Sequence, residues 1–293
     1  MMQAIFIATL HLAARPDLSA LYKTARTYDR AGFRFQPPAS EPLRRTRALL
    51  SHLVRALHAG PPPQALVTEA RAAGFELLAA RDQAGELWIV REPDGQRAGA
   101  GFFALRPGGS ALCLQAPHTF FDEGTGDIAL ALFARLRAGG LFFNTVHRYA
   151  PPDPPHHPAD VAHAEATHFA AANQGLLDAA PWTIVQVHGF GEKQGLGEVK
   201  AVVADGVSAR PADAPAPRLR VALAGRLGKG SVRLYGVDAD VLGATTNVEG
   251  KAARRAGVPF LHIELSGATR RALAKDAVPL ADALAEVLRA PPR

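Results

Sequence analysis

The sequence predicts an α/β fold, a three-layer sandwich with a mixed central sheet, and two patterns along the chain predict it. After about residue 110, strand candidates alternate with helical stretches, which is typical of a sheet covered by helices. Before that point, short strand candidates follow one another at hairpin-like spacing, which indicates antiparallel strands at one edge. With 293 residues the chain is long enough to bury one sizeable core.

Residues 1–60 are expected to form a helical N-terminal extension, and residues 61–293 the α/β domain. Leucines recur at near-helical spacing over residues 42–59, with arginines on the other face. The run Gly60-Pro-Pro-Pro63 ends that helix, and a second helix is expected over residues 64–73.

The rest of the chain is divided by its hydrophobic periodicity and its turn signals. We expect strands at 75–80, 86–91, 98–106, 111–116, 141–146, 182–187, 219–224, 231–236 and 259–265. We expect helices at 126–138, 160–174, 248–256 and 279–289, and a loop rich in proline and histidine at 151–158.

The charge pattern does not indicate a nucleic-acid partner. The formal net charge is +6 and the sequence pI is about 9.8, but the basic residues are scattered and form no stripe interleaved with aromatics. A modest preference for anionic partners, such as a substrate that carries carboxylates, fits this charge. The single cysteine, Cys113, excludes an internal disulfide and a thiolate zinc cluster, so any metal must be held by histidines and carboxylates.

The first 14 residues are apolar but lack the basic start of a secretory signal, so no signal peptide is expected. No stretch approaches the roughly 20 apolar residues of a transmembrane helix. A soluble protein is expected, cytoplasmic by default and extracytoplasmic if the true N-terminus carries an export signal.

Chemically unusual residues stand at the ends of three expected strands. His118 and the Asp122-Glu123 pair follow the strand at 111–116, His188 follows the strand at 182–187, and Glu264 lies in the strand at 259–265. In an α/β sheet, ligands and catalytic groups gather in the crevice beyond the strand ends. These side chains can therefore converge on one point.

Two histidines and one carboxylate form a zinc ligand set that leaves a fourth position for water. Zinc lowers the pKa of that water to about 7 and polarises the carbonyl that the water attacks. The reaction also needs a base, and Glu264 is the candidate. Each histidine could instead be an ordinary polar residue of a loop or strand end, and Asp122 or Glu123 could be the N-cap of the following helix. A carboxylate within Phe-Leu-His-Ile-Glu-Leu, in contrast, must be buried beside a partner.

At these residues the chain resembles the zinc-dependent poly-γ-glutamate hydrolases, which are related to zinc carboxypeptidases and share the phosphorylase/hydrolase-like fold. The resemblance lies in His118 with its nearby acid and Gly124-Thr125, in His188-Gly189, and in the segment from Gly257-Val258 to Glu264-Leu265-Ser266, with Asn247 upstream and Arg270 beyond. It spans about residues 118–271. It implies a Zn2+ cofactor in an amide hydrolase that acts on peptide or γ-glutamyl substrates bearing carboxylates.

The resemblance leaves the carboxylate ligand open between two neighbours. The family has a Gly-rich linker between the histidine and the acid, whereas this chain has Thr119-Phe-Phe121. Counting from His118 favours Glu123. Counting back from Gly124-Thr125 favours Asp122, which we prefer because the Gly-Thr pair begins the helix and fixes the direction of the carboxylate.

A second cluster is the candidate substrate-binding region. Arg148 or Arg270 could bind a substrate carboxylate bidentately. His147, Asp160 and His163 would order the pocket, with Asp160 and His163 three residues apart on one face of the helix expected there. A structural Arg148–Asp160 pair is an equal alternative, and a second metal at His147, Asp160 and His163 is a further one.

The sequence thus predicts a zinc hydrolase of an amide bond. The nearest alternative enzyme is an N-acyl amino acid deacylase with the same metal site, which a closed pocket rather than an open groove would favour. The alternative from another class is a non-catalytic domain that binds a glycan or peptide and has kept the fold.

Overall fold

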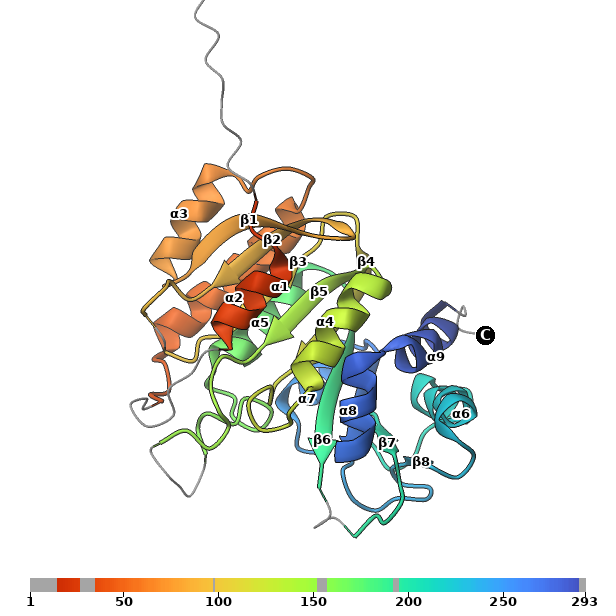
Figure 1. Cartoon of the computed structure of the whole chain (residues 1–293). Coiled ribbons are helices and arrows are strands. Elements are labelled where there is room, and N and C mark those ends of the chain that lie inside the picture. The colour runs from red at the N-terminus through yellow and green to blue at the C-terminus, as the bar shows by residue number, and fades with distance from the viewer. Residues whose placement is uncertain (1–14, 27–34, 97, 152–156, 192–194, 290–293) are drawn as a thin grey trace, which may run out of the picture.

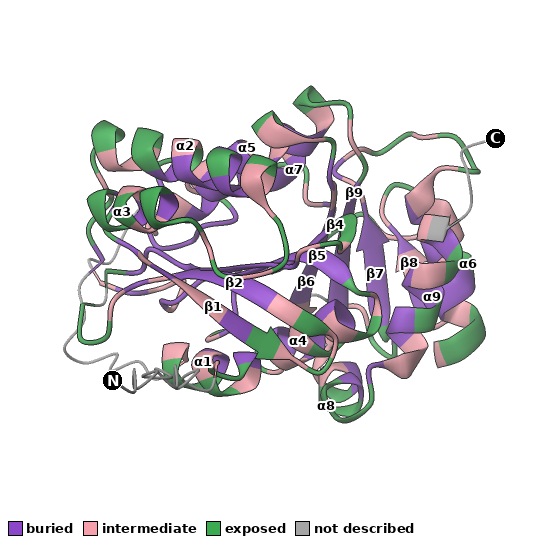
Figure 2. Ribbon diagram, turned by 90° about the horizontal axis from the view of Figure 1, so that it is seen from above, coloured by how far each residue is buried: buried purple, intermediate pink, exposed green. Residues whose placement is uncertain are grey.

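The computed structural model describes residues 15–26, 35–96, 98–151, 157–191 and 195–289. Nine strands in this part of the chain form one mixed sheet in the order β1-β2-β3-β5-β4-β6-β9-β7-β8. Helices cover both of its faces, as Figures 1 and 2 show. The predicted three-layer α/β sandwich is confirmed.

The sheet has an antiparallel edge and a parallel centre. Strands β1, β2, β3 and β5 pair antiparallel in succession, whereas β5, β4, β6 and β9 pair parallel. The bounds are β1 Glu76–Asp82, β2 Gly85–Arg91, β3 Phe102–Leu105, β4 Ser110–Ala116, β5 Ala138–Phe143, β6 Thr183–Phe190, β7 Ala201–Ala204, β8 Val232–Leu234 and β9 Phe260–Ser266. The hairpin-like spacing therefore predicted the antiparallel edge correctly.

The two helical layers enclose separate hydrophobic cores (Figure 2). One layer contains α2 (Ser40–Ala56), α3 (Gln64–Ala72), α5 (His168–Ala179) and α7 (Val248–Arg255). The other contains α1 (Leu18–Ala25), α4 (Thr125–Arg135), α6 (Pro215–Leu227), α8 (Gly267–Lys275) and α9 (Val278–Arg289). None of the helices in the described ranges has the length and apolarity to span a bilayer.

Residues before 60 contribute one helix to each layer. Leu18 and Tyr22 of α1 belong to one core, and Leu49, Leu50 and Leu53 of α2 belong to the other. The first 14 residues, for which no signal peptide is expected, lie outside the described residues. The division of the chain at residue 60 stays a prediction.

Two predicted elements are wrong. The helix expected over residues 160–174 begins only at His168, because Thr167 is its N-cap and accepts a hydrogen bond from the Ala170 amide with its side chain. Asp160 and His163 therefore lie in turns and not on a helix. The strand expected at 219–224 is part of α6, whose Pro215 stands at the start of a helix and whose buried residues recur at helical spacing.

The parallel strands in the centre of the sheet place the candidate site residues at their carboxyl ends. The carboxyl ends of β4, β6 and β9 lie side by side, because all three run in the same direction. Side chains alternate between the two faces of a strand. His188 and Glu264 are direct neighbours across β6 and β9 and share the face covered by α5 and α7.

Candidate metal site

A tight turn after β4 brings His118 and Asp122 together. The backbone amides of Phe121 and Asp122 both donate to the carbonyl of His118, at 2.9 and 2.7 Å. Gly124 then adopts a φ of +88° at the N-cap of α4, a conformation that favours glycine. The turn leaves the two side chains on one side, with His118 Nδ1 3.4 Å from Asp122 Oδ2.

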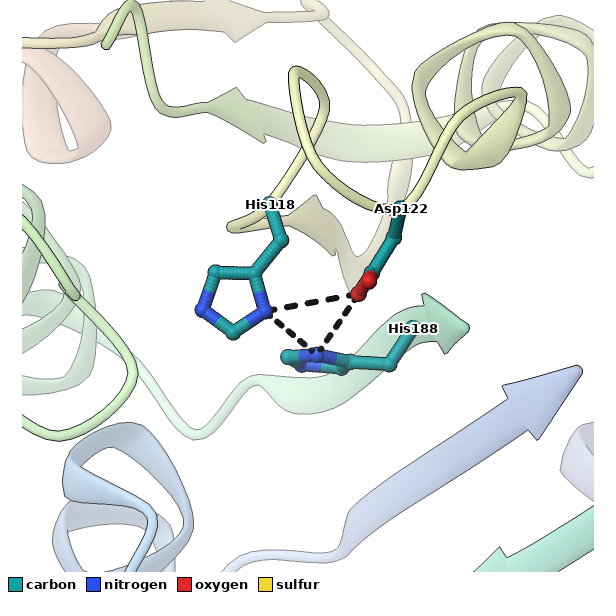
Figure 3. A group of neighbouring side chains, drawn as sticks. All are labelled: His118, Asp122 and His188. Carbon is teal, nitrogen blue, oxygen red and sulfur yellow. Dashed lines mark hydrogen bonds and ion pairs between the residues drawn. The ribbon is translucent and has the colours of Figure 1, made fainter. Parts of the chain in front are cut away.

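His188 of β6 completes a triangle of ligand atoms (Figure 3). Its Nδ1 lies 3.1 Å from His118 Nδ1 and 3.6 Å from Asp122 Oδ2. In a tetrahedral zinc site with ligands about 2.0–2.1 Å from the metal, neighbouring ligand atoms are about 3.4 Å apart. The spacing of the three side chains therefore fits a tetrahedral ion, and the donor set of two imidazoles and a carboxylate suits zinc.

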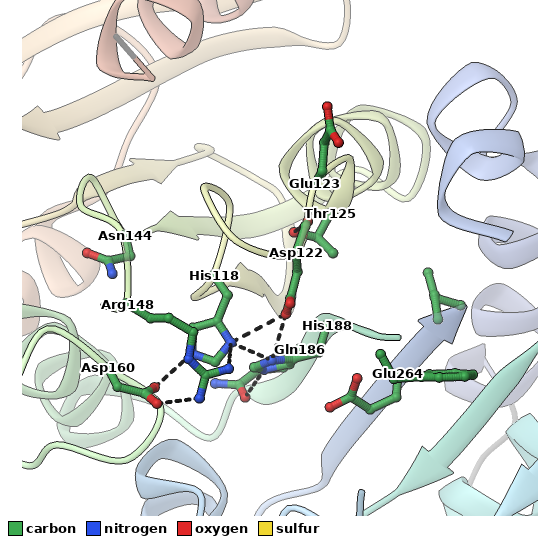
Figure 4. A network of polar contacts seen from close by, with 12 residues as sticks. His118, Asp122, Glu123, Thr125, Asn144, Arg148, Asp160, Gln186, His188 and Glu264 are labelled. Atoms are coloured by element: carbon green, nitrogen blue, oxygen red, sulfur yellow. Dashed lines mark hydrogen bonds and ion pairs between the residues drawn. The ribbon is translucent and has the colours of Figure 1, made fainter. Parts of the chain in front are cut away.

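The other ring nitrogen of each histidine is held by a neighbour. His118 Nε2 lies 2.8 Å from Asp160 Oδ1, and His188 Nε2 lies 3.1 Å from Gln186 Oε1 (Figure 4). Metal-binding histidines typically donate their second N–H to such a group, which fixes the ring and the tautomer. Both rings thus direct Nδ1 toward the same point.

Burial and pairing shift the protonation of these groups. Burial lowers the pKa of His188 to about 4, so its imidazole is neutral near pH 7 and keeps a lone pair for a metal. For His118 burial also acts to lower the pKa, but the hydrogen bonds to Asp122 and Asp160 outweigh it and raise the pKa. Burial acts to raise the pKa of Asp122, but the hydrogen bonds of His118 and His188 outweigh it, so the pKa is lowered and the group is an anion.

Only one of the two neighbouring acids points into the site. Asp122 is buried and faces the histidines, whereas Glu123 is exposed and points away from them (Figure 4). Of the two, only Asp122 joins the group of possible metal ligands. Helix α4 begins at Thr125 directly after Gly124, as the preference for Asp122 assumes, and the ligand role of Asp122 stays a prediction.

Glu264 lies beside the triangle in β9, directly opposite His188 in the neighbouring strand. Its Oε1 accepts a hydrogen bond from His262 Nε2 at 3.1 Å, if His262 carries its proton there. Its Oε2 is buried without a hydrogen-bond partner among the described residues. His188, His262 and Glu264 form a second group of possible metal ligands that shares His188 with the first.

Half-buried Arg148 and buried Asp160 form an ion pair next to His118. Arg148 Nη2 donates to Asp160 Oδ2, and Arg148 Nη1 lies 3.2 Å from His118 Nδ1 (Figure 4). The Arg148 guanidinium also lies 5.5 Å from the Phe121 ring and 5.3 Å from the Tyr149 ring. The structural pair is therefore formed, and the pair lies within reach of a molecule at the metal site.

The remaining predicted substrate-binding residues lie in different surroundings. His147 packs edge-on against Phe121, and His163 is exposed. His147, Asp160 and His163 are not among the groups of possible metal ligands in the described ranges. Arg270 donates from Nε and Nη1 to the backbone carbonyls of Glu123, Phe190 and Leu265 at 2.8–3.2 Å, so it ties the α4 turn to the ends of β6 and β9.

Comparisons with known proteins are limited to the fold. No family model and no curated protein matches the sequence. The chain is similar to the metallo-carboxypeptidase of Pseudomonas aeruginosa in complex with (2-guanidinoethylmercapto)succinic acid, with 14% identity, a TM-score of 0.41, and coverage of 77% of this chain and 68% of that one. A metallo-carboxypeptidase from Burkholderia cenocepacia has 14% identity and a TM-score of 0.40, with coverage of 78% of this chain and 70% of that one. The zinc-free apo form of YndL has 15% identity and a TM-score of 0.42, with coverage of 67% of this chain and 93% of that one.

Sequence reasoning missed the polar residues that surround the ligands. Gln115, Gln186 and His262 each lie between apolar neighbours in their strands, and all three are buried. A polar side chain in a buried strand must find a partner. The same argument that singled out Glu264 would have singled out these residues.

Proposed function

We propose that this protein is a zinc-dependent hydrolase of an amide bond, of the peptide or γ-glutamyl type, in a substrate that carries a carboxylate. The observation that supports it best is the triangle of His118 Nδ1, Asp122 Oδ2 and His188 Nδ1, with sides of 3.1–3.6 Å. The Nε2 atoms of the two histidines are hydrogen-bonded to Asp160 and Gln186.

His118, Asp122 and His188 would hold the zinc ion. When bound, zinc supplies an acidified water and polarises the substrate carbonyl. Glu264 then has the position and the free oxygen of a general base: its buried Oε2 takes the proton of the attacking water and returns it to the leaving amine. His262 orients the same carboxylate through Oε1.

Basic side chains support the choice of an anionic substrate. Arg148 lies between His118 and the exposed rim of Phe121, where its guanidinium could turn toward a substrate carboxylate. A cavity of about 800 Å³ also opens where β6 and β9 end, and Lys200, Arg270 and Arg271 are among its lining residues. Glu198 and Asp276 also line it, so three basic and two acidic side chains leave only a small excess of positive charge, which is compatible with a carboxylate-bearing chain.

The proposal is tested by zinc content and amide cleavage in the same preparations. Elemental analysis should find one zinc ion per chain in the wild type, a strong loss in His188→Ala and Asp122→Asn, and no loss in Glu123→Gln. Release of amine from γ-glutamyl and peptide amides should follow zinc content. A wild type that takes up no zinc, together with a His188→Ala variant that keeps full activity on every amide, would contradict the proposal.

A further inference from the structure

A row of buried polar side chains crosses the sheet two residues before His188 and Glu264 along their strands. Gln115 of β4 is opposite Gln186 of β6, and Gln186 is opposite His262 of β9. His188 and Glu264 form the next step on the same face. Gln115 and Gln186 are both fully buried. Such amides are tolerated in a core only when their hydrogen bonds are satisfied.

Helices α5 and α7 supply the partners of this row. Gln115 Nε2 donates to Asn173 Oδ1 of α5 at 2.8 Å. Gln186 Nε2 donates to Gln115 Oε1 at 2.8 Å and to Glu249 Oε2 of α7 at 3.1 Å. Gln186 Oε1 accepts from Asn247 Nδ2 at 2.7 Å and lies 3.1 Å from His188 Nε2. Both hydrogens and both lone pairs of the Gln186 amide are therefore used.

The backbone N–H of Gly250 determines which way the side-chain amides of Asn247 and Gln186 are turned. Asn247 is the N-cap of α7, and its side chain accepts a hydrogen bond from the Gly250 amide at 2.8 Å. A backbone N–H can only donate, so the atom of Asn247 that faces it is the oxygen, and the nitrogen faces Gln186. Gln186 must then present its oxygen to Asn247 and to His188. An oxygen beside His188 Nε2 requires the hydrogen on Nε2, which leaves the lone pair on Nδ1.

We propose that the start of α7 selects the metal-binding tautomer of His188: Asn247 and Glu249 fix the amide of Gln186, and Gln186 fixes His188 with its Nδ1 lone pair toward His118 and Asp122. The inference rests on the proposed function in one respect, that His188 is a metal ligand. Gln186, Asn247 and Glu249 are positioning residues, since they act on the metal through His188.

The deciding variant is Asn247→Asp, which keeps the helix cap but replaces the amide donor by a second oxygen. The Gln186 amide should turn over, so that its Nε2 faces both the new carboxylate and His188. The amides of Gln115 and Asn173 must turn with it, because the turned Oε1 of Gln186 then needs Gln115 Nε2 as its donor and Gln115 Oε1 needs Asn173 Nδ2. At pH 6 this is aided by Glu249, whose pKa burial raises to about 7, because its proton can be donated to the turned Oε1. His188 is then expected to carry its hydrogen on Nδ1, and the zinc affinity should fall roughly 10–100-fold.

The tautomer is read directly in metal-free, 15N-labelled protein at pH 6 from two-bond 1H–15N correlations of the imidazole rings, and zinc affinity is measured by competition with a chelator. The wild type should show His188 with hydrogen on Nε2. The matched control is Asp17→Asn, the reverse exchange at the N-cap of α1, which should leave His188 unchanged. Gln186→Glu keeps an oxygen that can accept from both Asn247 and His188, so His188 should retain its wild-type tautomer.

If Asn247→Asp does not fold, Gln186→Met tests the same point, because it removes the acceptor of His188 Nε2 and should lower zinc affinity while Gln186→Glu does not. Unchanged His188 signals and zinc affinity in Asn247→Asp, or in Gln186→Met, would overturn the inference and leave the proposed function intact. A wild type with the expected tautomer that takes up no zinc would overturn the proposed function and leave only the selection of the His188 tautomer standing.

Discussion

At the scale of single residues, the site combines histidine rings that are held by hydrogen bonds with a glutamate that has one oxygen without a hydrogen-bond partner among the described residues. The side chains of His118 and His188 are each fixed by a hydrogen bond on Nε2, so that their Nδ1 atoms are directed into the triangle. Glu264, in contrast, keeps one buried oxygen without a partner among the described residues. Fixed ligands and one uncommitted carboxylate are what a hydrolytic site requires, because the ligands must not move and the base must exchange a proton.

Glu264→Gln should separate catalysis from metal binding. The amide cannot take a proton from water, so we expect kcat to fall by roughly 10²–10⁴-fold while the zinc content stays at the wild-type value. Glu286→Gln, an exposed exchange of the same kind on α9, is the control and should change neither quantity. Full activity of Glu264→Gln on the substrate of the wild type would assign the base to another residue.

Glu249 should make folding sensitive to pH. Burial raises its pKa from 4.5 to about 7, although the hydrogen bond of Gln186 opposes the shift. As pH rises from about 4.5, the unfolded chain loses this proton while the folded chain keeps it until about pH 7, so the free energy of unfolding decreases over this window. The shift corresponds to roughly 3 kcal/mol.

Glu249→Gln lacks this titration. Urea unfolding at pH 5 and pH 8, with a chelator present, should therefore show the stability of the variant improving relative to the wild type at the higher pH. An equal difference between the two proteins at both pH values would show that Glu249 does not hold a proton in the folded protein.

At the scale of elements, close contacts decide how the helices sit on the sheet. Gly175 of α5 lies against α2, and a Cβ added there would lie 2.2 Å from the carbonyl oxygen of Arg47. α5 carries Asn173, the partner of Gln115, so the approach of α2 and α5 also positions the polar row below the site.

Gly175→Ala should destabilise the protein by about 1–3 kcal/mol, because the helices must separate to accept the methyl group. Gly225→Ala on α6 is the matched control: a Cβ there meets nothing within 4 Å, and alanine should stabilise the helix by about 0.4–1 kcal/mol. Both values follow from thermal or urea unfolding. Equal stability of the two variants would show that α2 and α5 are not in close contact in solution.

At the scale of the whole molecule, residues before 60 are tied to the core that lies under the site. Leu49, Leu50 and Leu53 of α2 are fully buried in the cluster that also contains Phe169 and Leu176 of α5. Burial of a leucine contributes about 1.5–3 kcal/mol relative to exposure. Loss of all three would cost about 4.5–9 kcal/mol, which is a large part of a typical folding free energy of about 5–15 kcal/mol.

A fragment of residues 61–293 tests the division of the chain. We expect it to lose cooperative unfolding and to bind hydrophobic dyes, because removal of α2 exposes the apolar face of α5 and the sheet. Circular dichroism and thermal unfolding of the fragment beside the full chain measure this. A fragment that melts cooperatively near the full chain's midpoint would support the helical extension and α/β domain predicted from the sequence.

The sequence by itself determined the fold class and the residues at the strand ends. Alternation of strands and helices, and hydrogen-bonding residues after apolar runs, are local patterns, and local patterns are visible in one dimension. They led to His118, His188 and Glu264, and the Gly124-Thr125 helix start favoured Asp122 over Glu123.

Only the tertiary structure decided how these residues are oriented. α6 was mistaken for a strand because its apolar run is short and ambiguous between the two periods. The start of α5 depends on a cap at Thr167, and the pairing of Asp160 with His118 spans 42 residues. The tautomer of His188 depends on Gln186, Asn247 and Glu249, which come from β6, the N-cap of α7 and α7 itself. Hydrogen bonds between distant segments leave no period in the sequence. The residue types of the site and the choice of Asp122 could therefore be predicted, but the protonation of the histidines and the direction of their rings could not.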